Sequence, residues 1–253
     1  MSVDACAALV ERGDPDRFRA VMAAPVALRG RLFVLYAYNL ELARAPWVTK
    51  EPMIAEMRLQ WWRDVVGEPG PRAHEVAGPI YDLIHQAGLP VPVLEAMGAA
   101  RVWDIYAEPF EDQAAMDSYL EDTSGGLMWL AALACGAAAK SEPVARGVGW
   151  AAGLANYLRA VPELEARGKR PLVDGRRGAV RDLALRGLQR LDEARKGRHA
   201  IGSAGPALLA AWQAEGLLRQ IVTEPERVAD GTMGLSPFAQ RGRLLWQAST
   251  GRW

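Results

Sequence analysis

Two groups of polar side chains interrupt otherwise apolar helical patterns, and they are the residues with which chemistry could be done. The first group lies between residues 28 and 63, where apolar residues recur at helical spacing. Buried polar groups need hydrogen-bond partners, so we expect a site where these side chains gather. The members of this first group are Asn39, Glu41, Arg44, Arg58 and Arg63.

The second group lies at the end of a predicted helix that begins at Pro143. Asn156, Arg159 and Glu163 are spaced i, i+3 and i+7, so they share one helix face. Glu165 is two residues beyond Glu163 and would point in another direction. Taken alone, this pattern is typical of a solvated helix end that carries an ion pair.

Other residues that could do chemistry are isolated. His74, His85 and His199 stand in different segments, and none has a partner at metal-site spacing. Ser124 has no base nearby in the sequence, so a nucleophilic role is not favoured. The chain has neither a Walker loop nor a dinucleotide-binding glycine motif before a strand.

The charge balance indicates which class of partner to expect, and the cysteine content indicates which cellular compartment. The 30 basic and 30 acidic residues balance, so there is no broad basic field and we expect no nucleic-acid partner. Cys6 and Cys135 lie far apart, which makes a structural disulfide unexpected and favours a reducing cytoplasm. Asp4, Glu11 and Arg12 interrupt any apolar signal-peptide core near the start of the chain.

The longest uncharged run, residues 123–139, is shorter than the roughly 20 apolar residues that span a bilayer. We therefore expect a buried core helix and no transmembrane span. Trp246 and Trp253 near the end of the chain are predicted to pack on the bundle, with contact to a membrane surface as the alternative.

The composition favours helix, because alanine, leucine and arginine dominate and β-branched residues are sparse. Pro46 closes one helix and Pro52 opens the next, while Pro162 is predicted to bend or break a later helix. We predict an all-α fold and a single domain over residues 1–253. The predicted helices cover approximately 3–12, 14–23, 28–45, 52–66, 75–87, 90–106, 116–138, 143–161, 180–196, 206–223 and 237–247.

Gly125 and Gly126 fall in the middle of the predicted 116–138 helix. Each glycine costs roughly 1 kcal/mol against alanine inside a helix. Such a pair is tolerated where a neighbouring backbone or a ligand comes close or where a helix kinks, and we favour close packing.

Four segments occur in an order and spacing that resemble the squalene/phytoene synthase family. They read YAYNLELAR, EMRLQWWRD, YLEDTSGGLMWLA and NYLRAVPELEARGKRPL. The likeness spans residues 14–173, and the C-terminal third matches only loosely. The resemblance implies an isoprenoid-synthase-type helical bundle whose central cavity binds two prenyl diphosphates and joins them head to head.

Enzymes of that family bring Mg²⁺ to the diphosphates with two aspartate-rich motifs on facing helices, since Mg²⁺ prefers hard oxygen ligands. The first motif should fall within residues 40–48 of this chain. Glu41 is the only acid there, and Ala43 and Arg44 stand close to the positions where aspartates are expected.

The second motif should fall at residues 160–164. Ala160 and Leu164 occupy the positions of its first and last aspartates, and only Glu163 is acidic. Two separated glutamates do not make a trinuclear Mg²⁺ site, so we expect no metal and no cofactor.

Polar residues remain around both altered motifs, and we call this set the pseudo-site. They could satisfy one another as a buried network or hold an anionic headgroup without metal, because arginine binds phosphate in bidentate fashion. The pseudo-site comprises Asn39, Glu41, Arg44, Arg58, Trp62, Arg63, Asn156, Arg159 and Glu163.

The Asn-x-Glu-Leu-Ala segment followed by Met-Arg-x-Gln-Trp-Trp-Arg looks more like one branch of the family. That branch includes the mitochondrial assembly factor of respiratory complex I and its bacterial relatives, and many members lack the aspartates. The resemblance implies a catalytically degenerate protein that acts in assembly of a membrane respiratory complex or binds a prenyl or lipid ligand. Its partners would be subunits of that complex, with a cytoplasmic location that is peripheral at the inner membrane.

Two other functions remain open. The first is an active head-to-head prenyl diphosphate transferase with altered ligands, which would require Mg²⁺ and would use Glu41, Tyr119 and Glu163. The second is a different bundle protein that carries a lipid or a carotenoid.

Overall fold

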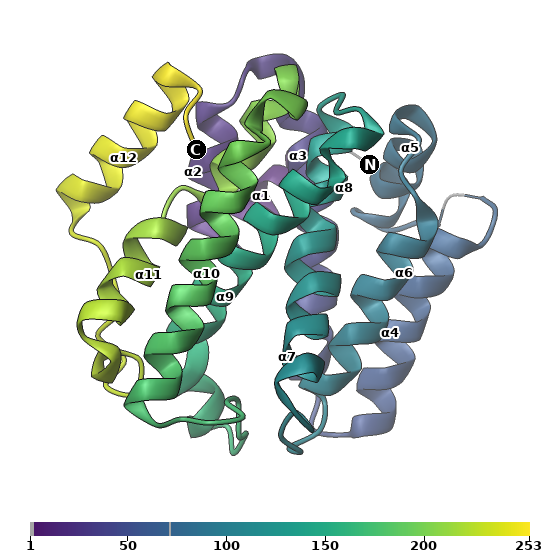
Figure 1. The fold of residues 1–253 in the computed structure, drawn as a ribbon. Helices are drawn as coiled ribbons and strands as arrows, with labels where there is room; N and C mark the ends of the chain where they lie inside the picture. Colours follow the sequence, from purple (N-terminus) through teal and green to yellow (C-terminus); the bar gives the residue numbers. More distant parts are fainter. Residues whose placement is uncertain (1–2, 71) are drawn as a thin grey trace.

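The computed structural model describes residues 3–70 and 72–253; residues 1, 2 and 71 of the predicted domain lie outside it. Every regular element in the described ranges is helical, which confirms the predicted all-α class. The helices form a bundle (Figure 1). They are α1 (Val3–Gly13), α2 (Pro15–Ala23), α3 (Val26–Arg44), α4 (Pro52–Gly67), α5 (Ala77–Ala87), α6 (Val91–Ala100), α7 (Gln113–Leu120), α8 (Gly126–Ala134), α9 (Glu142–Ala166), α10 (Arg177–Lys196), α11 (Ala214–Thr223) and α12 (Pro237–Thr250).

Short helical turns connect several of these helices. One is a π-helical turn, Glu121–Gly125, between α7 and α8. The 3₁₀ turns are Ala45–Trp47, Arg101–Asp104, Ala139–Ser141, Arg198–Ala200, Gly202–Ala211 and Pro225–Arg227.

The long helices α3 and α9 form the interior of the bundle. All residues from 32 to 40 in α3 and from 148 to 155 in α9 are buried. A helix that is apolar and buried on every side belongs in a core, whereas a surface helix buries only one stripe. Polar side chains on these two helices are therefore the ones that tertiary contacts must satisfy.

Close contact joins α9 to the π turn. A Cβ atom on Gly149 would lie 2.5 Å from the Ser124 carbonyl oxygen and 2.6 Å from the Met128 Cβ. A Cβ atom on Gly153 would lie 2.4 Å from the Ser124 Cβ. Because these glycines are four residues apart on one helix face, they allow the turn backbone to rest directly on α9.

The helix predicted over residues 116–138 is present over residues 113–134 as α7, the π turn and α8 without a gap, so the π turn interrupts its regular α geometry and it ends four residues earlier than predicted. The Thr123 hydroxyl donates a 2.6 Å hydrogen bond to the Tyr119 carbonyl oxygen within the π turn. The close packing expected at the glycine pair is present, because a Cβ on Gly126 would lie 3.1 Å from Val93.

Pro162 was predicted to bend or break the helix, and the break is wrong, because α9 continues through Pro162 to Ala166. Proline removes one N–H from the helix ladder, but the end of α9 is well capped. The Lys169 N–H, for example, donates to the Leu164 carbonyl oxygen at 3.1 Å. The extra turn matters because it carries Leu164 onto the wall of the cavity described below.

A third difference concerns residues 206–223, which were predicted as one helix. The structure has the 3₁₀ segment Gly202–Ala211 and then α11. Pro206 lies inside the 3₁₀ segment, and its missing N–H does not terminate that segment. The corner between the two segments, residues 210–214, reaches the cavity.

Both cysteines are free and buried, as the sequence led us to expect. Burial raises the pKa of the Cys6 and Cys135 thiols to about 11. Across residues 3–70 and 72–253, no helix has the length and apolar character needed to cross a bilayer.

The glycine contacts of α9 can be tested by substitution. We expect Gly149→Ala to lower the free energy of unfolding by about 1–3 kcal/mol. The added methyl group would overpack the contact with the Ser124 backbone, and this penalty is larger than the gain from the higher helix propensity of alanine. Gly242→Ala in α12 is the matched control, since a Cβ there meets open space. Urea titration of both variants measures the difference, and equal stabilities would contradict the contact.

Candidate functional site

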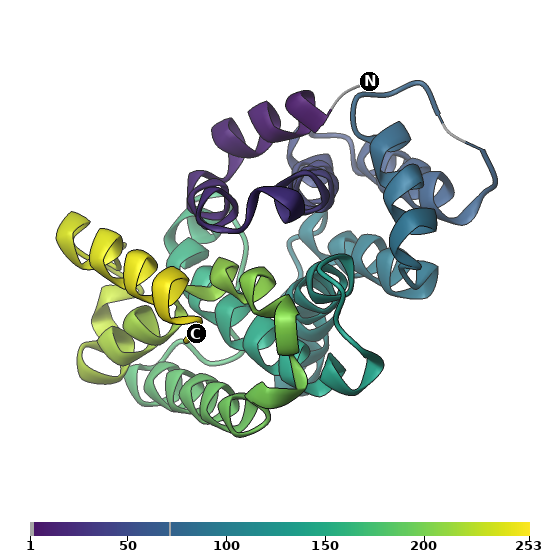
Figure 2. The ribbon, with the colours of Figure 1, turned by 90° about the horizontal axis from the view of Figure 1, so that it is seen from above.

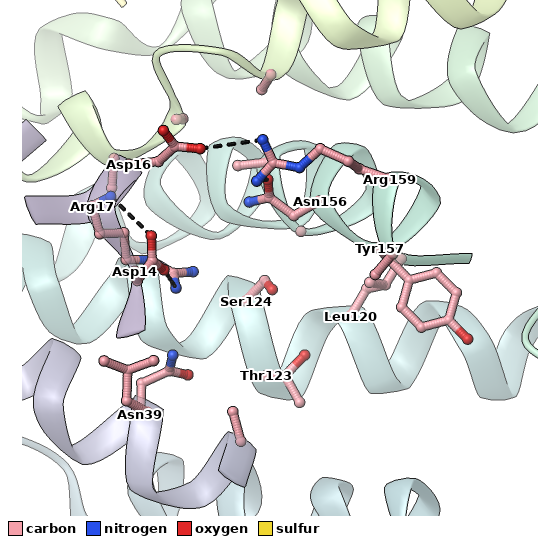
Figure 3. Close-up of a pocket in the computed structure, with 18 of the residues that line it drawn as sticks. Asp14, Asp16, Arg17, Asn39, Leu120, Thr123, Ser124, Asn156, Tyr157 and Arg159 are labelled. Carbon is pink, nitrogen blue, oxygen red and sulfur yellow. Dashed lines mark hydrogen bonds and ion pairs between the residues drawn. The ribbon is translucent and has the colours of Figure 1, made fainter. Parts of the chain in front are cut away.

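A central cavity of about 530 Å³ lies between the two long helices (Figure 3). Its wall is formed by the α1–α2 corner, α3, the Arg101–Asp104 turn, the end of α7 with the π turn, α9 and the 210–214 corner. Segments distant in the sequence therefore meet at one place. This agrees with the central cavity that the sequence resemblance implied.

Four of the residues singled out from the sequence line this cavity: Asn39, Tyr119, Asn156 and Arg159. Asn39 projects from the buried part of α3, and Figure 3 shows Asn156 on the opposite side of the cavity. The Arg159 guanidinium donates a 3.2 Å hydrogen bond to the Asn156 side-chain oxygen. The cavity therefore brings together polar residues from both groups recognised in the sequence.

The remaining pseudo-site residues do not line the central cavity, so the nine do not form one network. Glu41 faces Arg44 at 3.7 Å, and the Arg44 side chain is more than half exposed. Glu163 is exposed and pairs with Arg167 at 2.6 Å. Both glutamates lie on helices that contribute other residues to the cavity, but they project from different faces.

Arg58, Trp62 and Arg63 lie on α4, which packs on α6 and not along the cavity wall. Arg58 is exposed to solvent. Trp62 is buried, with ring centroids 5.7 Å from Tyr38 and 5.2 Å from His74. The Arg63 Nε is buried and has no hydrogen-bond partner within the part of the chain described.

The α1–α2 corner adds charged residues that the sequence analysis missed. Asp14 is the N-cap residue of α2 and accepts a 2.9 Å hydrogen bond from the Arg17 N–H. It also pairs with the Arg17 side chain at 2.6 Å, while Asp16 pairs with Arg159 at 3.1 Å (Figure 3). Asp16 and Arg159 are 143 residues apart, so no local pattern signals their contact.

A third ion pair at the cavity wall was also missed. Arg101 donates to the Asp104 carboxylate at 2.9 Å and to the Tyr119 hydroxyl at 2.8 Å. The Tyr119 hydroxyl in turn donates to Asp104 at 3.0 Å. Burial raises the pKa of Tyr119, so the phenol remains protonated and continues to donate its hydrogen to the Asp104 carboxylate.

The loop after α9 holds this corner in place. The Lys169 ammonium is buried and donates to the carbonyl oxygens of Trp103, at 3.0 Å, and of Tyr106. Burial lowers the pKa of Lys169. The Tyr157 hydroxyl donates to the Pro171 carbonyl oxygen at 2.7 Å. These bonds join the loop to the turn that carries Arg101 and Asp104.

Three positions near those that the sequence resemblance assigned to aspartates do face the cavity, but they carry apolar residues. These are Ala43, Ala160 and Leu164. The carboxylates that do line the cavity are each engaged by an arginine, and Mg²⁺ would need those same oxygens. Among residues 3–70 and 72–253, no three His, Cys, Asp or Glu side chains are grouped to share a metal ion. The residues present do not fit a Mg²⁺ cluster of the family's kind.

Two solved structures share the fold of this chain. A dehydrosqualene synthase matches with a TM-score of 0.79 and 13% identity, covering 98% of this chain and 95% of that one. A squalene synthase from Alicyclobacillus acidocaldarius matches with a TM-score of 0.73 and 15% identity, covering 92% and 95%. These matches confirm the predicted isoprenoid-synthase-type bundle.

Curated relatives share more of the sequence. The Drosophila melanogaster homolog of NADH dehydrogenase (ubiquinone) complex I, assembly factor 6, is 30% identical over 178 residues, which are 66% of this chain and 53% of that protein. The Homo sapiens assembly factor 6 is 24% identical over 168 residues, covering 65% and 50%. The chain thus spans about half the length of the curated relatives it matches.

A family model described as squalene/phytoene synthase matches residues 10–173. That range agrees closely with the resemblance over residues 14–173 found in the sequence, and it covers more than half of the chain. On this match, and with the shared bundle around it, the chain belongs to the squalene/phytoene synthase family.

Proposed function

We propose that this protein is a non-catalytic member of its family that acts in the assembly of a membrane respiratory complex. The observation that carries the proposal is the cavity wall at the two motif positions. Ala43, Ala160 and Leu164 face the cavity where metal-binding carboxylates would be needed. Methyl and isobutyl groups offer no oxygen to Mg²⁺, and ionising an allylic diphosphate without such a clamp is difficult.

The charges on the cavity wall also argue against a diphosphate ligand. Each arginine there is already paired with a carboxylate, so the wall has no surplus positive charge. A prenyl diphosphate would meet these carboxylates without Mg²⁺ to screen them. We therefore propose a lipid or isoprenoid that lacks a diphosphate as the ligand of the cavity. The charged residues are Asp14, Asp16, Arg17, Arg101, Asp104 and Arg159.

The assembly role is supported by the curated relatives, whose printed names describe assembly factors of respiratory complex I. The family match over residues 10–173 includes the ion pairs of the cavity and its whole wall except the 210–214 corner. We propose subunits of such a complex as the partners, a peripheral position at the membrane that holds it, and one domain over residues 1–253.

Calorimetric titration with farnesyl and geranylgeranyl diphosphate, with and without Mg²⁺, tests the missing metal site. We expect Mg²⁺ to leave any binding unchanged and no diphosphate to be released on incubation, because the donor set does not fit the metal. An active squalene synthase assayed in parallel is the control. Mg²⁺-dependent turnover would overturn the proposal and support the alternative of an active head-to-head transferase.

Deletion of the gene from its source cells tests the assembly role. Membranes of the deletion strain should lose NADH:quinone oxidoreductase activity, because the proposed partner complex is not completed. Succinate:quinone activity should be unchanged and serves as the internal control. Restoration by the full chain is expected, and full NADH:quinone activity in the deletion strain would refute the role.

The buried ion pair at the cavity wall should be structural. We expect Asp104→Asn to lower the free energy of unfolding by about 3 kcal/mol, because Arg101 then keeps a largely buried charge without its counter-ion. Glu41→Gln is the matched control and should cost less than about 1 kcal/mol, since its partner Arg44 is more than half exposed. Denaturant titration compares the two; similar losses would contradict this assignment.

A further inference from the structure

Three large apolar residues of α12 point away from the protein, whereas Leu244 packs against the core. Phe238, Leu245 and Trp246 are 89%, 72% and 50% exposed. Their spacing of seven and eight residues from Phe238 places them on one face of the helix. A solvated surface helix normally turns such a face toward the core, so this helix has the opposite arrangement.

The inward side of α12 carries a buried polar residue beside Leu244. Gln247 is the one residue of α12 that is fully buried, and it lies nine residues from Phe238, on the opposite side of the helix. Its side-chain oxygen has no hydrogen-bond partner within residues 3–70 and 72–253. The packing of α12 on α2 and on the Gly202–Ala211 segment therefore does not account for its three exposed apolar side chains.

The charge of this part of the chain has one sign. Residues 231–253 contain Arg241, Arg243 and Arg252 and no aspartate or glutamate. Arg241 and Arg252 are exposed and form no ion pair with the described residues. Figures 1 and 2 show α12 at the periphery of the bundle, where its outer face is not covered by another helix.

A second cavity, of about 520 Å³, lies beside α12 and is separate from the central one. Four arginines line it, with a single carboxylate, Glu215. Hydrogen bonds from Arg195 and Arg219 outweigh burial and lower the pKa of Glu215 to about 2. The negative charge of this carboxylate is therefore balanced by neighbouring arginines. The lining residues are Arg195, Arg198, Glu215, Arg243, Trp246, Gln247, Arg252 and Trp253.

We propose that α12 docks the protein on an anionic phospholipid membrane. Phe238, Leu245 and Trp246 enter the boundary between headgroups and acyl chains, and the arginines contact lipid phosphates. Helices that lie in a membrane interface combine Trp, Phe and Leu on one face with basic residues on the other. Arg198 and Arg252 at the second cavity offer a place for one headgroup beside the inserted face.

The charge pattern selects this occupant. An apolar face alone would suit a second copy of the chain or another protein. A stretch with three arginines and no acid repels its own copy but is attracted to the negative surface of a bilayer. The inference rests on the peripheral membrane position of the proposed function and deepens it by naming the helix and the lipid class. Its evidence is α12 and its neighbouring arginines, so the vesicle test can fail while the deletion test of the assembly role succeeds.

Sedimentation of the full chain with vesicles provides the test. Binding is expected to vesicles that contain phosphatidylglycerol, to be much weaker with phosphatidylcholine alone, and to fall as salt rises. The variant Phe238→Ser/Leu245→Ser/Trp246→Ser should bind at least about tenfold more weakly. Arg241→Ala and Arg252→Ala should each weaken binding about fivefold.

The control is Met53→Ser/Met57→Ser, which removes exposed apolar side chains from α4 instead and should bind vesicles as the unmodified protein does. Circular dichroism melting checks that each variant is folded. The proposal is overturned if the unmodified protein does not bind anionic vesicles. It is equally overturned if the triple α12 variant binds them as strongly as the double α4 control. It is also overturned if light scattering shows a dimer that the α12 variant dissociates, since the face would then be a self-interface.

Discussion

The direct contact of α9 with the π turn is the constraint on which the site depends. Gly149 and Gly153 remove the side chains that would hold the two backbones apart. The turn can then present Thr123 and Ser124 to the cavity from one side while Asn156 and Arg159 line it from another. A side chain at either glycine would push α9 away and change the shape of the whole wall, because packed interiors transmit such displacements.

Within this frame, arginine–aspartate pairs occupy the region where related synthases would gather metal and diphosphate. Asp16 pairs with Arg159 across 143 residues of sequence, whereas Asp104 pairs with Arg101 within one 3₁₀ turn, and each pair cancels its charges. In the buried Arg101–Asp104 pair each charge needs the other, because a buried charge without its partner is costly. The cavity is thereby kept polar, nearly neutral and unsuited to Mg²⁺, which agrees with the non-catalytic role proposed above.

The proposed assembly role depends on the surface of the protein. The family match ends at residue 173, and α12 lies well beyond it with Phe238, Leu245 and Trp246 turned outward. A protein that assists assembly must meet its partners at a membrane, and a helix lying in the membrane interface would bring the bundle there. The central cavity and the α12 face are separate features, so one can bind a ligand while the other holds the protein in position.

The sequence by itself determined the helical class, most helix boundaries and the family, because helix propensity, proline and glycine positions and motif order are local properties. It also identified Asn39, Asn156 and Arg159, since polar residues on apolar stripes stand out, while Tyr119 was named only through the family resemblance. Tertiary structure alone decided that Glu41, Glu163 and the α4 residues face elsewhere, and that Asp16 meets Arg159. The reason is physical: the direction of a side chain around a helix becomes meaningful only when the neighbouring helices are placed, and contacts over 143 residues leave no local pattern.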